Sequence, residues 1–246
     1  MPGPPEWRYI AEAADLDAAI QRMRASGLAH WVGDLPGAPD LSTIEQTLMR
    51  SVVQLVRDLK RWLPPGWDGV RRWLDDGVGL VYVRALLRPT RLELPAGVDP
   101  ALQEAAAADP ADRRSILAKT RYARYLGDGV PTMDRWLGAF PAALPQTRGR
   151  EAYVLARLQK LAADHLGSLG EVRRQWQRTD DPAALDADIQ WRLREELERN
   201  LRDLLGGYPF HAGFFLVCAL LELLQFERCR ALLMARAYGW EATGVL

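Results

Sequence analysis

The sequence predicts an all-α fold, a bundle of about nine or ten helices, and three observations support this prediction. Apolar residues recur at steps of three and four along most of the 246 residues, which is the period of an amphipathic helix. Capping residues, prolines and glycines divide the chain at intervals of helix length. Strand-like alternation is confined to Leu92-Glu93-Leu94, in a Pro- and Gly-rich stretch that is either a loop or one short extended piece.

The composition is that of a globular protein, with 48% hydrophobic and 26% charged residues. The 32 Lys and Arg residues balance 32 Asp and Glu residues, which argues against non-specific nucleic-acid binding because such binding needs a basic excess. The start at Met1 to Pro5 lacks the pattern of a signal peptide. The longest uncharged apolar stretch, Tyr208 to Leu221, is shorter than the ~20 residues of a membrane span. We therefore expect a soluble protein.

The N-terminal part of the chain contains the clearest helix signals. Asp15 is placed to cap a short helix that ends at Gly27. The capping-box pattern Ser42-Thr43-Ile44-Glu45 opens a long amphipathic helix, which Pro64-Pro65-Gly66 ends. Its apolar stripe consists of Ile44, Leu48, Val52, Leu55, Leu59 and Leu63. Two short helices follow, one around Val70, Trp73 and Leu74 and one from Leu80 to Leu87.

The remaining helices are predicted from Asp-Pro starts and Gly or Pro stops. Asp99-Pro100 and Asp109-Pro110 each start a helix, and the second is expected to run as far as Leu126. A short helical pattern from Met133 to Phe140 comes next. Three long helices complete the prediction: Arg150 to Trp176 with a weak point at Gly167 to Gly170, Asp181-Pro182 to Gly206-Gly207, and Ala212 to Tyr238 with a deeply buried first half.

Searches for catalytic and metal-binding patterns lead to no candidate site. Phosphate-binding loops, dinucleotide fingerprints and nucleophile elbows are absent from the sequence. The three histidines, His30, His165 and His211, lack metal-ligand spacing, and Cys218 and Cys229 are expected to be core thiols in a reducing cytosol. Two acidic pairs lack the third Asp of a magnesium-binding helix face: Asp75-Asp76, interpreted as a helix end or turn, and Asp180-Asp181, interpreted as a helix cap. We therefore predict no catalytic residues, no cofactor and no metal site.

One short phrase occurs twice in the chain. Arg84-Ala85-Leu86-Leu87 ends one apolar segment, and Arg230-Ala231-Leu232-Leu233 lies in the last helix. Arg84 and Arg230 are expected to pack their stems among apolar residues while their heads reach a carboxylate or a helix end. We interpret the pair as a structural repeat that forms a recurring internal bridge. The nine tryptophans are interpreted first as packing residues and second as partner contacts.

Three segments resemble the C subunit of A/V-type rotary ATPases, which is called the d subunit in eukaryotes. Leu41 to Leu48 resembles the family's Ile-Glu-x-x-Leu helix opening, and Tyr82 to Arg88 resembles its Asn-Leu-Lys-x-Leu-Leu-Arg phrase. Arg228 to Arg236 resembles its Asn-Leu-Arg-x-Ile-Leu-x-Gly-Lys phrase. The chain departs from the pattern where Tyr82 and Arg228 replace the Asn and Ala235-Arg236 replaces Gly-Lys, and it is shorter than typical members.

The resemblance implies a funnel-like arrangement of helices with degenerate pseudo-threefold repeats. It also implies a non-catalytic central-stalk adaptor, which receives the rotor shaft and sits on the membrane proteolipid ring, so that it supports proton or sodium transport. Such a subunit is cytoplasmic and peripheral to the inner membrane, with no membrane span of its own. We expect a single helical domain over residues 1–246, with two helical sub-bundles as a further option (1–145 and 146–246).

Two other functional hypotheses stay open on the sequence. The chain could be an unrelated helical scaffold or regulatory interaction protein that binds its partner through a surface rich in Trp and Arg. It could also be an all-α enzyme with an acidic site that no known motif describes.

Overall fold

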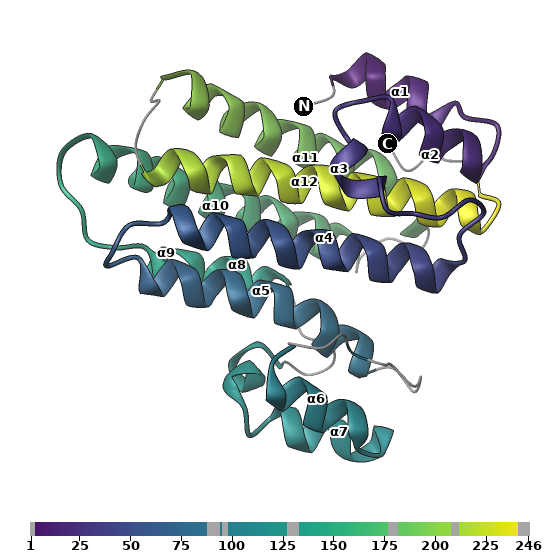
Figure 1. The fold of residues 1–246 in the computed structure, drawn as a ribbon. Helices are drawn as coiled ribbons and strands as arrows, with labels where there is room; N and C mark the ends of the chain where they lie inside the picture. The colour runs from purple at the N-terminus through teal and green to yellow at the C-terminus, as the bar shows by residue number, and fades with distance from the viewer. Residues whose placement is uncertain are drawn as a thin grey trace. The chain divides into compact units, whose positions relative to one another are not determined.

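The computed structural model describes residues 3–87, 94, 98–126, 133–176, 182–207 and 212–240. These residues form α-helices and one 3₁₀ helix (η1), without a strand in the described ranges, so the all-α prediction is confirmed (Figure 1). The elements are α1 (Pro4–Ala11), α2 (Leu16–Arg24), α3 (Ala29–Val32), α4 (Leu41–Trp62), α5 (Asp68–Leu86), α6 (Pro100–Ala107), α7 (Pro110–Leu117), η1 (Arg121–Tyr125), α8 (Met133–Gly138), α9 (Phe140–Ala143), α10 (Gly149–Trp176), α11 (Pro182–Gly207) and α12 (Ala212–Ala237). The funnel-like arrangement and the pseudo-threefold repeat stay predictions.

The chain divides into two compact units. Unit 1 consists of Met1–Trp62 together with Gly167–Leu246, and unit 2 consists of Leu63–Leu166. The single-domain prediction and the two predicted sub-bundles stay predictions. No helix in the described part of the chain is long and apolar enough to cross a bilayer.

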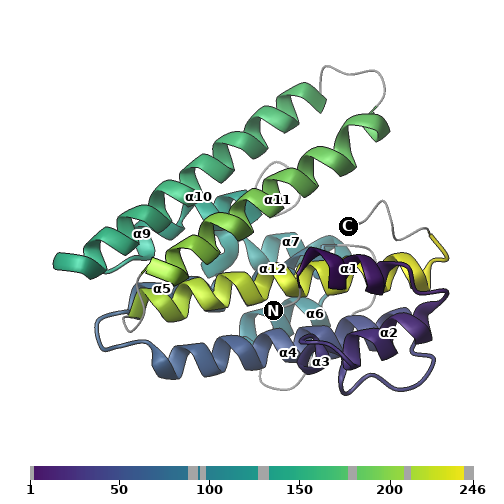
Figure 2. The same cartoon turned by 90° about the horizontal axis from the view of Figure 1, so that it is seen from above.

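Unit 1 is built around α12. This helix packs along α4 and also contacts α2 and α11, and Figures 1 and 2 both show α4 and α12 side by side. The two helices are antiparallel, because Glu45 meets Arg230 near one end and Trp62 stacks on Phe215 near the other. The first half of α12 was predicted to be deeply buried on all faces, and this is only partly correct. Leu216, Val217 and Leu221 are buried, whereas Phe214, Phe215, Cys218 and Leu220 are half-buried.

Unit 2 is built around α5, which contacts α6, α7, α8, α9 and η1. Two glycines make close approach to this helix possible. A Cβ atom at Gly77 would lie 2.5 Å from the Trp136 ring, and one at Gly79 would lie 2.2 Å from the Tyr122 hydroxyl. The Trp73 and Trp136 rings stack with centroids 4.0 Å apart, and each indole N–H donates a hydrogen bond to the other residue's backbone carbonyl. The small residues of α5 therefore serve to admit large aromatic neighbours.

Four local predictions are wrong. The two short helices expected from Val70 to Leu87 are one continuous helix, α5, so Asp75-Asp76 lies mid-helix and not at a helix end. Asp40, not Ser42, caps α4, since its carboxylate accepts a hydrogen bond from the Thr43 backbone N–H at 2.7 Å. The helix expected from Asp109-Pro110 to Leu126 ends at Leu117 and gives way to η1. The expected weak point in α10 is absent, because the helix continues through Gly167 to Gly170.

Candidate interaction sites

The predicted residue Arg230 joins the two main helices of unit 1. Its Nε donates to Glu45 Oε2 at 3.0 Å, and its Nη2 donates to Glu45 Oε1, so the guanidinium binds the carboxylate in a bidentate manner. The hydrogen bond with Glu45 raises the pKa of Arg230 against the opposing effect of burial. The pair connects residues 185 positions apart in the chain. It therefore fixes the register of α12 on α4.

The other copy of the repeated phrase, Arg84-Ala85-Leu86-Leu87, lies at the end of α5 in unit 2. Leu86 of this copy is fully buried, as are Leu232 and Leu233 of the copy in α12. Arg84 falls within α5, but its side chain lies outside the described residues. The recurrence of an internal bridge at Arg84 thus stays a prediction.

A buried polar network lies next to this helix pair in unit 1. Glu198 of α11 forms an ion pair with Arg228 of α12, in which Glu198 Oε2 lies 3.0 Å from Arg228 Nη2. Glu198 Oε1 also accepts a hydrogen bond from Arg202 on the same helix. Gln225 donates to Glu198 Oε1 at 3.3 Å and accepts from the Trp7 indole N–H at 3.2 Å. Only 6% of the Arg228 side chain is exposed, and this burial lowers its pKa although the charge of Glu198 opposes the effect. The network ties α1, α11 and α12 together.

Unit 2 contains a second cluster, carried by η1. The sequence of η1 is Arg-Tyr-Ala-Arg-Tyr, and side chains three apart eclipse one another in a 3₁₀ helix. Arg121 and Arg124 therefore share one face, whereas Tyr122 and Tyr125 share another. The two tyrosines are buried, and the Arg side chains are 44% and 58% exposed. Thr120 caps the helix by accepting a hydrogen bond from the Tyr122 backbone N–H at 3.2 Å.

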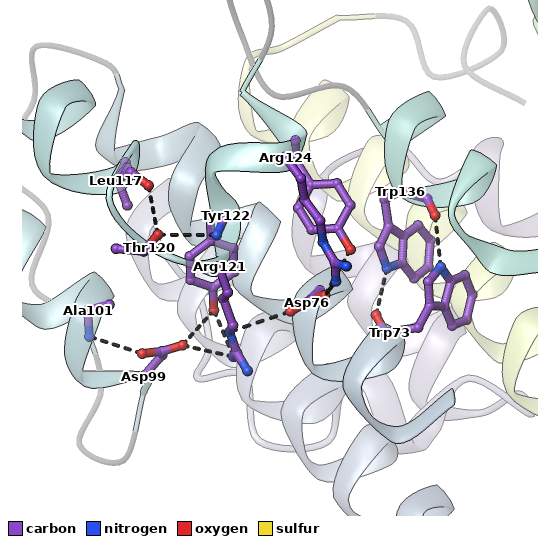
Figure 3. A network of polar contacts seen from close by, with 11 residues as sticks. Trp73, Asp76, Asp99, Ala101, Leu117, Thr120, Arg121, Tyr122, Arg124 and Trp136 are labelled. Atoms are coloured by element: carbon purple, nitrogen blue, oxygen red, sulfur yellow. Dashed lines mark hydrogen bonds and ion pairs between the residues drawn. The ribbon is translucent and has the colours of Figure 1, made fainter. Parts of the chain in front are cut away.

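Asp76 of α5 anchors this cluster from below (Figure 3). Its side chain is 1% exposed, and its Oδ2 accepts hydrogen bonds from Arg124 and, at 2.8 Å, from the Tyr125 hydroxyl. Its Oδ1 lies 3.4 Å from Arg121 Nε but accepts no hydrogen bond, so this contact is an ion pair only. Both arginines thus point their inner edges at one buried carboxylate.

Asp99, the cap of α6, completes the cluster. Its Oδ2 lies 2.8 Å from Arg121 Nη2 and accepts a hydrogen bond from the Tyr122 hydroxyl at 3.0 Å. Partial burial lowers the pKa of Arg121, but the hydrogen bond with Tyr122 and the nearby Asp charges outweigh this, so its pKa is raised. Burial raises the pKa of Tyr122, and burial together with Asp76 raises the pKa of Tyr125 to about 12. Arg121 therefore stays cationic, and Tyr122 and Tyr125 stay neutral, near pH 7.

Two aromatic pairs in unit 1 are exposed to solvent. Trp62, which is 66% exposed, stacks on Phe215, and Tyr238 stacks on Trp240 after the end of α12. Of the other predicted helix tryptophans, Trp73 and Trp136 are buried, and the side chains of Trp176 and Trp191 lie outside the described residues. The exposed pairs are candidate partner contacts, since Trp and Tyr are enriched in interface hot spots.

The histidines, cysteines and acidic residues that the sequence offered as candidates for chemistry form no metal-binding group in the described part of the chain. Within the described ranges no three His, Cys, Asp or Glu side chains gather to hold a metal ion. His30 lies 3.0 Å from Glu222, and burial raises the pKa of the Cys229 thiol. His165 is half-buried on α10 and has a polar or ring partner, whereas His211 and Asp180-Asp181 lie outside the described residues.

Sequence reasoning did not single out Glu45 as an ion-pair partner, nor Asp76, Glu198, Arg121 and Arg124. The three-residue spacing of the two Arg-Tyr doublets in η1 was the one local signal that pointed to a shared face. Comparison of the chain with models of known protein families, with curated proteins and with solved structures finds no match.

Proposed function

We propose that this chain is a non-catalytic central-stalk adaptor of an A/V-type rotary ATPase. It couples the rotor shaft to the membrane proteolipid ring and supports proton or sodium transport from the cytoplasmic side of the inner membrane. The observation that carries the proposal is the Glu45–Arg230 pair. Glu45 belongs to the segment that resembles the family's helix opening, and Arg230 to the segment that resembles its C-terminal phrase.

The pair supports the proposal because two segments that resemble the same family, and that lie far apart in the sequence, meet in one antiparallel helix contact. The first segment contains one charged residue, Glu45, and this residue faces Arg230, one of the three arginines of the second segment. A bidentate Arg–carboxylate pair also adds geometric specificity to apolar packing. An adaptor that transmits torque needs helices with a fixed register, and this contact provides one.

The experiment is affinity purification of the tagged chain from gently solubilised native membranes, followed by mass spectrometry. We expect the shaft and proteolipid subunits to be recovered with the wild-type chain. Arg230→Glu places two carboxylates together and should reduce the recovery, whereas the double variant Glu45→Arg with Arg230→Glu should restore it. Arg61→Glu is the matched control, because Arg61 pairs with Asp58 across the surface of its own helix, at 3.2 Å.

A wild-type chain that recovers no rotary subunit, while the motor is detected in the input, would contradict the proposal. That result would favour an unrelated helical scaffold or regulatory protein. The exposed Trp62–Phe215 and Tyr238–Trp240 pairs favour this second candidate, because solvent-facing aromatic pairs are typical of partner contacts. Trp62→Ala and Trp240→Ala would then reduce the recovery of whatever partner the wild-type chain brings along.

A further inference from the structure

All charged side chains of the segment that contains η1 are positively charged. From residue 113 to residue 124 it contains cationic side chains and no acidic one: Arg113, Arg114, Lys119, Arg121 and Arg124. Arg113 is buried and donates to the Leu86 backbone carbonyl at 3.2 Å. The other four are exposed. Most of the charge of this segment therefore faces solvent.

The two arginines of η1 are held in place before any partner arrives. Asp76 and Asp99 engage their inner edges, and the guanidinium of Arg124 also lies 4.7 Å from the centroid of the Tyr125 ring. A guanidinium has five N–H donors, so each arginine keeps donors on its solvent side. Because their rotamers are already restricted, binding through these donors costs less entropy than binding through free arginines. Ala123, which is exposed on the neighbouring face of η1, is small and leaves room for an incoming group.

We propose that this face of η1 binds an acidic helix of a partner protein through two carboxylates three or four residues apart. A 3₁₀ helix rises about 2 Å per residue, so side chains three apart are separated by about 6 Å along its axis. Side chains three or four apart on an α-helix have Cβ atoms at a similar spacing of about 5–6 Å. The N–H donors that remain on each guanidinium can form charge-assisted hydrogen bonds with one carboxylate.

A helix fits these observations better than a nucleic acid. Tight binding to a duplex relies on many phosphate contacts, about 6–10 in well-studied cases, and a zero net charge provides no general attraction. The η1 face offers two aligned arginines, which suits a short acidic motif. This inference goes beyond the rotary-adaptor role and does not depend on it, since its test uses no rotary subunit.

The test is fluorescence anisotropy with a labelled helical peptide that carries Glu at positions four apart, in low salt. The full chain should bind this peptide and should not bind a peptide with Gln in place of each Glu. Ala123→Glu adds a negative charge on the face of η1 next to the two arginines without removing an internal contact, and should weaken binding about tenfold or more, as the loss of a charge-assisted bond does. Gln103→Glu, an exposed site on α6 with the same charge change, should leave binding unchanged.

A second variant keeps the test decisive if Ala123→Glu folds poorly. Arg124→Lys retains a charge beside Asp76 but lacks the planar fork, so it should weaken binding several-fold while the urea midpoint changes little. Equal binding by wild type and both η1 variants would overturn the proposal. So would an equal loss in Gln103→Glu, which would indicate a response to net charge alone, or tighter binding to a labelled DNA duplex than to the acidic peptide.

Discussion

Unit 1 and unit 2 each bury a carboxylate that two arginines hold, but they differ in where the arginines lie. Glu198 in unit 1 is held by Arg228, which is itself buried, and the network continues inward to Gln225 and Trp7. Asp76 in unit 2 is held by Arg121 and Arg124, whose heads are about half exposed. The unit 1 network thus contains a buried arginine, Arg228, beside the 40% exposed Arg202, whereas both arginines of the unit 2 network are about half exposed.

The exposure of the arginines determines what an arginine–carboxylate cluster can do. A buried arginine has lost its hydration and depends on its carboxylate, so the pair in unit 1 mainly specifies how three helices pack. A half-exposed arginine keeps part of its hydration and keeps free donor positions, so the cluster in unit 2 can present charge to a partner. If this comparison is correct, equivalent changes in the two clusters should have unequal effects on stability.

The largest effect is expected for Glu198→Gln. The variant keeps the side-chain volume but leaves Arg228 buried without its nearest opposite charge. Breaking one partner of a buried pair typically costs about 3–5 kcal/mol, and we expect a loss of this size in the free energy of unfolding measured with urea. Glu196→Gln is the control, because Glu196 is exposed on the same helix and should change stability by less than about 0.5 kcal/mol. Equal effects at the two positions would mean that the burial of Arg228 does not make the stability of the protein depend on Glu198.

The next effect concerns the packing beneath the unit 2 cluster. Gly77→Ala places a Cβ atom 2.5 Å from a Trp136 ring that stacking and two hydrogen bonds hold in place. We expect a net loss of about 2 kcal/mol on thermal or urea unfolding, although alanine is the better helix former.

Gly167→Ala is the matched comparison for this variant. Gly167 is also helical, but an added Cβ there meets no atom within 4 Å. We expect stabilisation of about 0.5–1 kcal/mol, since only the helix propensity changes. Stabilisation by Gly77→Ala as well would show that Trp136 can move away from α5.

A smaller effect is expected for Asp76→Asn. Its two arginines can turn to solvent when the carboxylate is lost, so the cost should be about 1.5 kcal/mol, less than for Glu198→Gln. Urea unfolding measures the difference directly. Asp68→Asn is the control on the same helix, because Asp68 is exposed and pairs with Arg71 across one turn at 3.0 Å. A cost for Asp76→Asn as large as that of Glu198→Gln would mean that exposure of the arginines gives no relief.

The helices were easier to predict from the sequence than the contacts between them. Helix patterns predicted α4, α10 and α12 well, because an apolar stripe and its end signals are local features. The sequence pattern predicted two short helices on either side of Gly77 and Gly79, whereas the structure has one helix through both. Their role depends on Trp136 and Tyr122, which lie far along the chain, and local propensity contains no information about such partners.

Charged partners were harder to predict than helices. Glu45 fitted a capping box, yet its carboxylate binds Arg230, 185 positions away. Asp40 caps the helix in place of Ser42, and its hydrogen bonds with Thr43 lower its pKa. Asp40 and Ser42 both suit an N-cap position in sequence. The pairing of Glu45 with an arginine depends on the position of α12, which the local sequence does not contain.

The smallest expected effect tests whether Tyr125 is covered by the arginine face. Tyr125→Phe removes a hydrogen bond to Asp76 and should cost about 1 kcal/mol near pH 7. The pKa of Tyr125 is raised to about 12, whereas an unfolded tyrosine titrates near 10. The native state therefore holds a proton that the unfolded state loses, so the contribution of the hydroxyl is complete below pH 10 and disappears as the pH rises through 12. The stability difference between wild type and variant, measured by urea unfolding at several pH values, should shrink across this window. A difference that stays constant from pH 10 to 12 would mean that the hydroxyl titrates as it does in the unfolded chain, and that the cluster is open to solvent at its base as well as at its surface.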